Sequence, residues 1–257
     1  MRAIATLICA LAVLGWSADT RAEKLVVGLS STTVHITSNF TGADLTLFGA
    51  IERDHTTKNR LAAYDVVIVL RGPDQSIVAR RKEWFFGIWV NRRSRVFKTV
   101  PAFYEVVANR PMDDMLTEEF RKEKQIGIDA VDLGPVPWTE EVFGEPEAFK
   151  SAFLRLKTDS GLYRDYQTGV SFLSANLFRA KLILPENIPV GRFAVSVYLL
   201  SDGEMLERKD QTLTITKSGF ESTITNLATN HALFYGLGTV ALALFTGWVG
   251  GVVFRRD

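Results

Sequence analysis

Apolar and polar side chains alternate along much of the chain, and this period of two predicts a protein built mainly from β-strands. In residues 43–52 the inward positions of the expected strand are Leu45, Leu47, Gly49 and Ile51. Residues 64–70 form an apolar run that ends in an Arg-Gly-Pro-Asp turn, which is typical of a central strand buried on both faces. Residues 192–200 alternate again and lead through Ser-Asp-Gly-Glu into residues 205–216, which predicts a hairpin.

The middle of the chain has helical spacing instead. Residues 113–124 follow Pro111 and stop at Gly127, and residues 147–157 carry a second apolar stripe. We therefore expect a helical excursion at about residues 112–160. Seven or eight short strands with turn signals around it predict an immunoglobulin-like β-sandwich in residues 23–217, without the Cys-Trp-Cys pattern of antibody domains.

A longer apolar segment, residues 232–254, contains no charged residue. As a helix it would measure about 34 Å, enough to cross a hydrocarbon core of ~30 Å, and only a helix satisfies its own backbone in lipid. We predict a transmembrane helix here. The Ser-Gly-Phe-Glu sequence at residues 218–221 has the spacing of a capping box, so residues 218–231 are predicted as a juxtamembrane helix that runs unbroken into the span.

Residues 1–22 have a basic start, a short apolar run and a Thr-Arg-Ala site, the pattern of a cleaved signal peptide. The alternative is an uncleaved N-terminal anchor. Arg255 and Arg256 follow the span directly, whereas residues 218–230 contain no Lys or Arg, so the tail, residues 255–257, is expected in the cytoplasm. Both signals predict a type I single-pass protein, whose body would be periplasmic in a bacterium.

Charge and cysteine content narrow the classes of function. The chain has 30 basic and 29 acidic residues, and 28 of each remain once residues 1–22 are removed, which argues against nucleic-acid binding. The only cysteine, Cys9, lies in the signal segment, so we expect neither a disulfide nor a cysteine ligand. No catalytic or phosphate-binding motif occurs, and we expect no cofactor and no metal.

Residues 80–98 are the strongest local anomaly. They contain seven basic residues and one acid, Glu83, around the apolar centre Trp-Phe-Phe-Gly-Ile-Trp-Val. One interpretation is a docking surface for a protein partner or for anionic lipid headgroups. The other is a buried strand with solvated charged ends. The candidate binding residues are Arg80, Arg81, Trp84, Trp89, Arg92 and Arg93.

Two further patterns bear on contacts. Residues 113–147 hold eleven acids against three bases. This pattern indicates a solvated acidic helix face. The alternatives are a segment that packs on or caps the basic one, a surface for a cationic partner, and a metal site, although no D-x-D-x-D-G loop is present. In the span, Gly247 and Gly251 form a small-xxx-small pair that permits close packing against another helix.

The chain resembles a family of uncharacterised alphaproteobacterial transmembrane proteins. The residues that carry the resemblance lie along most of the chain beyond the signal segment: Gly87 to Asn91, Val100 to Tyr104, Phe178 to Ala180, Leu184-Pro185, Pro189 to Gly191 and Tyr235-Gly236. The resemblance implies a bacterial inner-membrane protein with a periplasmic domain and no assigned reaction. It also implies, as one candidate partner, a sulfite-exporter-type permease.

Three hypotheses for the function follow. The first is a non-enzymatic, membrane-tethered interaction module that serves a transporter or envelope complex, with membrane lipid and another membrane or periplasmic protein as its partners. The second is a periplasmic sensor or binding protein for an anion or solute, with Arg80, Arg81, Arg92 and Arg93 as ligands. The third, an enzyme using Asp54 and His55, lacks any nucleophile with a base and an orienting group.

Overall fold

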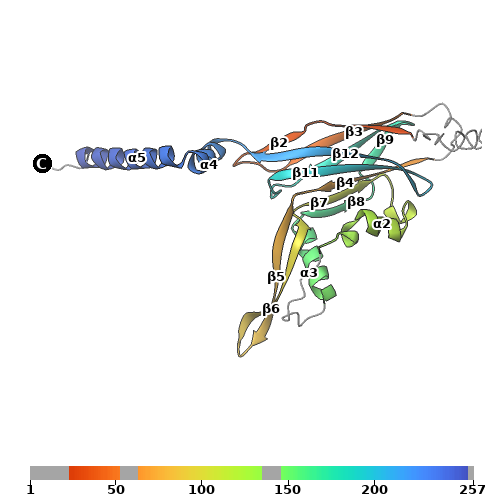
Figure 1. The fold of residues 1–257 in the computed structure, drawn as a ribbon, viewed down its shortest axis with the longest axis horizontal. Helices are drawn as coiled ribbons and strands as arrows, with labels where there is room; N and C mark the ends of the chain where they lie inside the picture. Colours follow the sequence, from red (N-terminus) through yellow and green to blue (C-terminus); the bar gives the residue numbers. More distant parts are fainter. Residues whose placement is uncertain (1–22, 53–62, 135–145, 254–257) are drawn as a thin grey trace, which may run out of the picture.

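The computed structural model describes residues 23–52, 63–134 and 146–253. Figure 1 shows a β-sandwich with helices on one side, a long hairpin that projects from it, and a helical rod that leaves one end of the sandwich. The predicted signal segment, Asp54, His55 and the tail at residues 255–257 lie outside the described residues.

The first sheet has four strands in the order β1-β3-β10-β9, all antiparallel. Its strands are β1 (Lys24–Leu29), β3 (Ala43–Glu52), β10 (Leu177–Leu184) and β9 (Val170–Ser174). Leu45, Leu47 and Ile51 are buried on its inner face, as their alternation predicts. The ring of Phe178 lies over Gly49, where an added Cβ would come within 2.0 Å of the ring.

The second sheet has six strands in the order β2-β12-β11-β4-β7-β8. They are β2 (Thr33–Ile36), β12 (Glu204–Lys217), β11 (Gly191–Ser201), β4 (Tyr64–Arg71), β7 (Tyr104–Ala108) and β8 (Tyr163–Tyr166). β1 pairs in the first sheet, whereas β2, a few residues later, pairs parallel to β12 in the second. This change of sheet by the first strand, together with the two strand orders, identifies an immunoglobulin-like sandwich and confirms the predicted fold class.

Hydrophobic side chains fill both faces of the second sheet. On the inner face Val66, Ile68 and Leu70 of β4 meet the first sheet, and on the outer face Val67 and Val69 belong to a second cluster. All of these side chains are buried, which confirms the prediction that residues 64–70 form a central strand buried on both faces.

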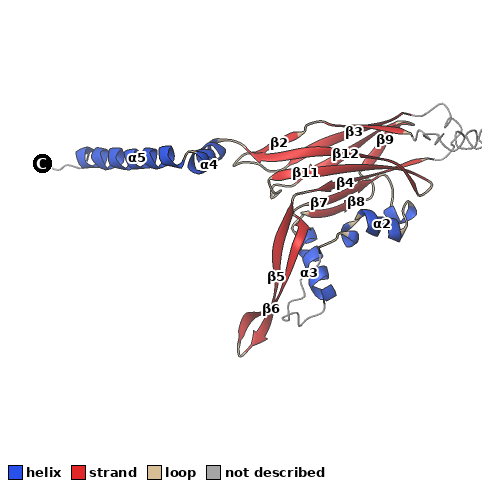
Figure 2. Ribbon diagram, in the orientation of Figure 1, coloured by secondary structure: helices blue, strands red, loops and turns tan. Residues whose placement is uncertain are grey.

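The helical excursion covers the outer face of the second sheet (Figures 1 and 2). Its elements are η1 (Met112–Asp114), α2 (Glu118–Lys124), η2 (Ile128–Ala130) and α3 (Pro146–Asp159). The single helix predicted over residues 113–124 is wrong, because the chain makes a short 3-10 turn and then restarts at α2, where the Thr117 side chain caps the Phe120 N–H. The Tyr104 hydroxyl donates to the Gln125 carbonyl at 2.5 Å and ties the end of α2 to the sheet.

Two helices follow β12, namely α4 (Phe220–Asn230) and α5 (Ala232–Val253). The prediction of one unbroken helix is wrong, because His231 has φ −134° and ψ 45° and interrupts the rod. The N-cap of α4 is Gly219 rather than the Ser218 of the expected capping box. Among the described residues, α5 is the one helix long and apolar enough to cross a membrane, and none of its surface is buried against the sandwich.

Candidate interaction surface on a projecting hairpin

The basic and aromatic residues at 80–98 lie on a hairpin that leaves the sandwich between β4 and β7. It consists of β5 (Asp74–Phe85) and β6 (Ile88–Pro101), which pair only with each other. Phe86 and Gly87 form the two-residue turn with φ 46° and 83°, the positive values of a type I′ hairpin turn. Glycine suits such a turn, but a phenylalanine at positive φ is strained, so the turn holds an aromatic ring at its apex against backbone preference.

The base of the hairpin belongs to the core. Phe97 is buried and its ring lies 5.3 Å from that of Phe153 on α3, centroid to centroid. Val100 is buried as well, and Ile77 and Ala79 pack against the same cluster. These contacts fix the direction in which the rest of the hairpin projects.

Beyond this base the hairpin ends in an exposed apolar surface, which we call the aromatic tip: Trp84, Phe85, Phe86, Ile88 and Trp89. The Phe86 side chain is 89% exposed, and Trp84 and Trp89 are 60% and 65% exposed. The two tryptophans face each other across the strands with their ring centroids 5.4 Å apart in an edge-to-face arrangement. The interpretation of residues 80–98 as a buried strand is therefore wrong.

Next to the tip lies a group of exposed cations, which we call the basic band: Arg80, Arg81, Lys82, Arg92 and Arg93. The guanidinium of Arg92 lies 4.7 Å from the centroid of the Phe85 ring, and Arg93 Nε lies 3.2 Å from Glu83 Oε1. Arg81 stands directly across from Arg93, whereas Arg80 stands across from Ser94 and so lies on the opposite face. Of the four arginines of the anion-binding hypothesis, Arg80 and Arg81 line a cleft beside α3 and Arg92 and Arg93 do not, so the four do not converge on one pocket.

The acidic residues of the excursion do not neutralise the basic band through any ion pair of the described residues. Asp113 pairs with Arg121, Glu118 with Lys122 and Glu123 with Lys124, all within the excursion itself. The described residues therefore favour a solvated acidic surface, in which three of the acids form ion pairs within the excursion.

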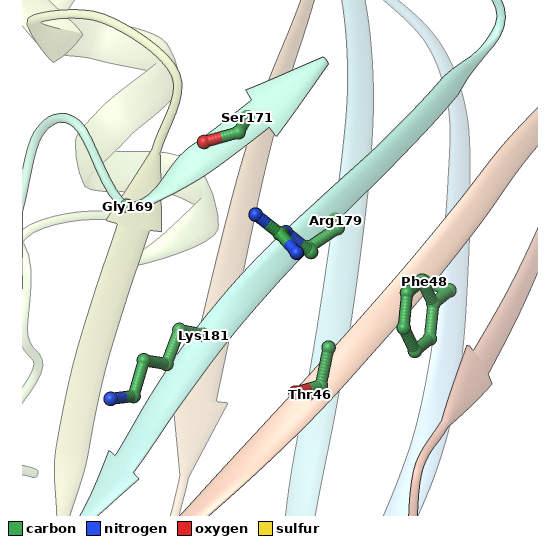
Figure 3. Close-up of a pocket in the computed structure, with 6 residues that line it drawn as sticks. All are labelled: Thr46, Phe48, Gly169, Ser171, Arg179 and Lys181. Atoms are coloured by element: carbon green, nitrogen blue, oxygen red, sulfur yellow. The ribbon is translucent and has the colours of Figure 1, made fainter. Parts of the chain in front are cut away.

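The described residues form two hollows. A cleft of about 630 Å³ separates β5 from α3 and is lined mainly by apolar side chains, among them Ile77, Phe149 and Leu156. The candidate residues Arg80 and Arg81 also line this cleft. A second hollow of about 390 Å³ lies on the outer face of the first sheet, where Arg179 stands between Ser171 and Phe48 (Figure 3). Lys181 lines it as well. Lys181 there also binds Asp44 at 2.7 Å. Sequence reasoning missed both, because each is formed by segments far apart in the chain.

Glu105 is an unusual ionisable group in the interior of the described residues. Glu105 on β7 is fully buried, and neither carboxylate oxygen has a hydrogen-bond partner among the described residues. Burial raises the pKa of Glu105 to about 7, against smaller lowering effects of the Ile183 backbone and Arg164. No group of three or more His, Cys, Asp or Glu side chains in the described part of the chain has the geometry of a metal site.

Gly247 and Gly251 lie in the last turns of α5, and a Cβ added at either position would meet no described atom within 4 Å. The surface of the span that would pack against another helix is therefore open. Whether it is used in that way stays a prediction.

Comparison with curated proteins gives no match. A family model described as "Putative transmembrane protein (Alph_Pro_TM)" matches residues 24–256, which include the sandwich, the hairpin and the terminal helix. The chain therefore belongs to this family of transmembrane proteins.

Proposed function

We propose that this protein is a non-enzymatic interaction module, tethered to the bacterial inner membrane by α5 and acting in the periplasm as an accessory to a transporter or envelope complex. The observation that carries the proposal is the aromatic tip. Five large apolar side chains are exposed together at the end of an element that projects from the core. Contiguous exposed apolar surface of this kind typically marks a site of interaction with a protein or a membrane.

The remainder of the architecture supports a contact role. The base of the hairpin is held in the core while the described side chains at its end are exposed, so the hairpin presents residues at a distance from the sandwich. The open glycine surface of α5 offers a second place for a partner inside the membrane. The proposal needs neither a cofactor nor a catalytic residue, and a sulfite-exporter-type permease is the first partner to look for.

The experiment that tests this function is chemical crosslinking of the full-length protein in native membranes, followed by pull-down and mass spectrometry. The wild type is compared with a tip variant, Trp84→Ser/Phe86→Ser/Trp89→Ser, and with a span variant, Gly247→Ile/Gly251→Ile. We expect a transporter or envelope protein to be recovered with the wild type and lost with the tip variant.

A matched control removes three exposed apolar side chains elsewhere: Val26→Ser/Phe48→Ser/Leu173→Ser on the outer face of the first sheet. This control should recover the same partner as the wild type. Recovery of an identical set of proteins with the wild type, the tip variant and the span variant would contradict the proposed function.

A further inference from the structure

The aromatic tip is apolar on both faces of the hairpin. Trp84 and Trp89 are directly paired across the strands and share one face, and the next pair, Phe85 and Ile88, lies on the other. Phe86 stands at the turn between them. A strand that adds to a protein sheet usually offers alternate side chains to pockets on one side. Because the tip is apolar on both faces, it fits an environment that surrounds it with apolar groups better than a single pocket on one side.

The basic band likewise occupies both faces, immediately behind the tip. Arg81 and Arg93 form a directly opposed pair of like charges, an arrangement that is unfavourable unless an anion lies between or beside them. Glu83 supplies one negative charge at this level, paired with Arg93, and Arg81 and Arg92 remain exposed. The charge of the band is therefore complementary to an extended anionic surface rather than to one carboxylate.

We propose that the hairpin is a second membrane contact, with the aromatic tip entering the headgroup region of an anionic bilayer and the basic band resting on its phosphates. Tryptophan and other aromatic rings favour this interfacial zone, and arginine side chains next to it bind anionic lipid. The inference rests on the proposed function, because it names the partner class of the same hairpin in a protein that is tethered to a membrane.

The dimensions of the molecule allow the tip to reach the membrane that α5 crosses. β5 has 12 residues and extends about 40 Å at ~3.3 Å per residue. α4 has 11 residues, so it separates the sandwich from the start of the span by only about 16 Å. In Figure 1 the hairpin leans toward the end of the sandwich from which the rod leaves. The sandwich has to tilt about its connection to α4 to bring the tip the rest of the way to the membrane.

The test uses the full chain reconstituted in nanodiscs of phosphatidylcholine alone or with a third of phosphatidylglycerol. In a Cys9→Ser background, which has no other cysteine, Phe86→Cys carries an environment-sensitive nitrobenzoxadiazole probe at the tip. Asp202→Cys carries the same probe at the exposed turn between β11 and β12. We expect brighter, blue-shifted emission and quenching by spin-labelled lipid for the Phe86 position in anionic discs only, and no change at Asp202.

A charge variant tests the basic band. The variant replaces four arginines of the band: Arg80→Gln/Arg81→Gln/Arg92→Gln/Arg93→Gln. It should shift the equilibrium between the inserted tip and the tip in water toward water, by about fivefold for each arginine at low salt. The matched control Lys24→Gln/Arg179→Gln/Lys181→Gln/Lys209→Gln removes the same charge from exposed positions off the hairpin and should insert like the parent.

Two results would overturn the lipid assignment: a Phe86 probe that stays in water in both compositions, or equal insertion in neutral and anionic discs. The outcome is separate from that of the proposed function. If the probe stays in water but the tip variant loses its partner in native membranes, the proposed function stands and the tip docks on a protein. If the probe inserts but all variants crosslink alike, the lipid contact stands and the accessory role fails.

Discussion

At the scale of single residues, Glu105 is a carboxylate in an apolar part of the sandwich. Glu105 lies on β7 between Tyr104 and Val106, which face the outer cluster, and so it points toward the inner core. Its cross-strand neighbour on β4 is Leu70, fully buried in that core. Burial removes water from the carboxylate and so makes its ionised form less favourable. This is why the pKa of Glu105 is raised to about 7.

We expect Glu105 to make the fold less stable as the pH rises. The folded pKa of about 7 lies above the ordinary value of 4.5, so the folded state binds the proton more tightly. The free energy of unfolding should therefore fall between pH 4.5 and pH 7, by up to about 3 kcal/mol, and level off above. Glu105→Gln should abolish this decline and be the more stable protein at alkaline pH.

The measurement is thermal or urea unfolding of both full-length proteins in detergent across this range. Asp165, whose pKa burial also raises, is present in both proteins, so its contribution cancels in the comparison. Parallel pH profiles for the wild type and Glu105→Gln would show that Glu105 does not cause the decline.

At the scale of elements, the hairpin divides into a part that holds the fold and a part that does not. Phe97 at the base is buried against Phe153, whereas the side chains of the aromatic tip are exposed, and the ring contacts between described residues join them to each other and to the basic band. The residues that stabilise the fold are therefore different from the exposed residues that we propose to bind a partner, although both lie on the same two strands.

This division predicts opposite effects of two changes. Phe97→Ala should lower the free energy of unfolding by about 3–5 kcal/mol, because it leaves a cavity beside Phe153. The tip variant Trp84→Ser/Phe86→Ser/Trp89→Ser should change the free energy of unfolding by no more than about 0.5 kcal/mol per site, as is usual for exposed positions. Unfolding curves of the two variants measure both quantities. A tip variant as unstable as Phe97→Ala would mean that the tip is part of the core.

Much of the fold at this scale could be predicted from the sequence, because alternation reports which face of a strand is buried. It succeeded for Leu45, Leu47 and Ile51 and for the doubly buried β4. It could not place the hairpin, because Trp-Phe-Phe-Gly-Ile-Trp has the composition of a core strand, and only the register shows that β5 and β6 pair with nothing else. The break at His231 was missed for a similar reason, since the apolar stripe continues through it while the backbone does not.

At the scale of the whole molecule, the sandwich and the membrane helix are joined by the chain that continues from β12. β12 pairs with β11 along its length and leads through Gly219 and α4 into α5. The type I orientation that we propose puts the sandwich in the periplasm and the end of α5 at the cytoplasm.

Fusions to alkaline phosphatase, which is active only outside the cytoplasm, test this orientation. A fusion after Asp257 should be inactive, and a fusion after Asn230 that replaces the span should be active. Equal expression of the two fusions on immunoblots is the control. The reverse pattern of activity would place the sandwich in the cytoplasm and overturn both proposals.

The tether has a consequence for how strongly the hairpin needs to bind. A sandwich held by a short link to a membrane meets that surface, and any protein anchored beside it, at an effective concentration in the millimolar range. A contact with a dissociation constant of about 1 mM would then be occupied roughly half of the time, although the same contact would be almost undetectable between dilute soluble partners. If the aromatic tip binds as we propose, a weak and rapidly reversible contact is enough, and loss of α5 would abolish it without altering any residue of the tip.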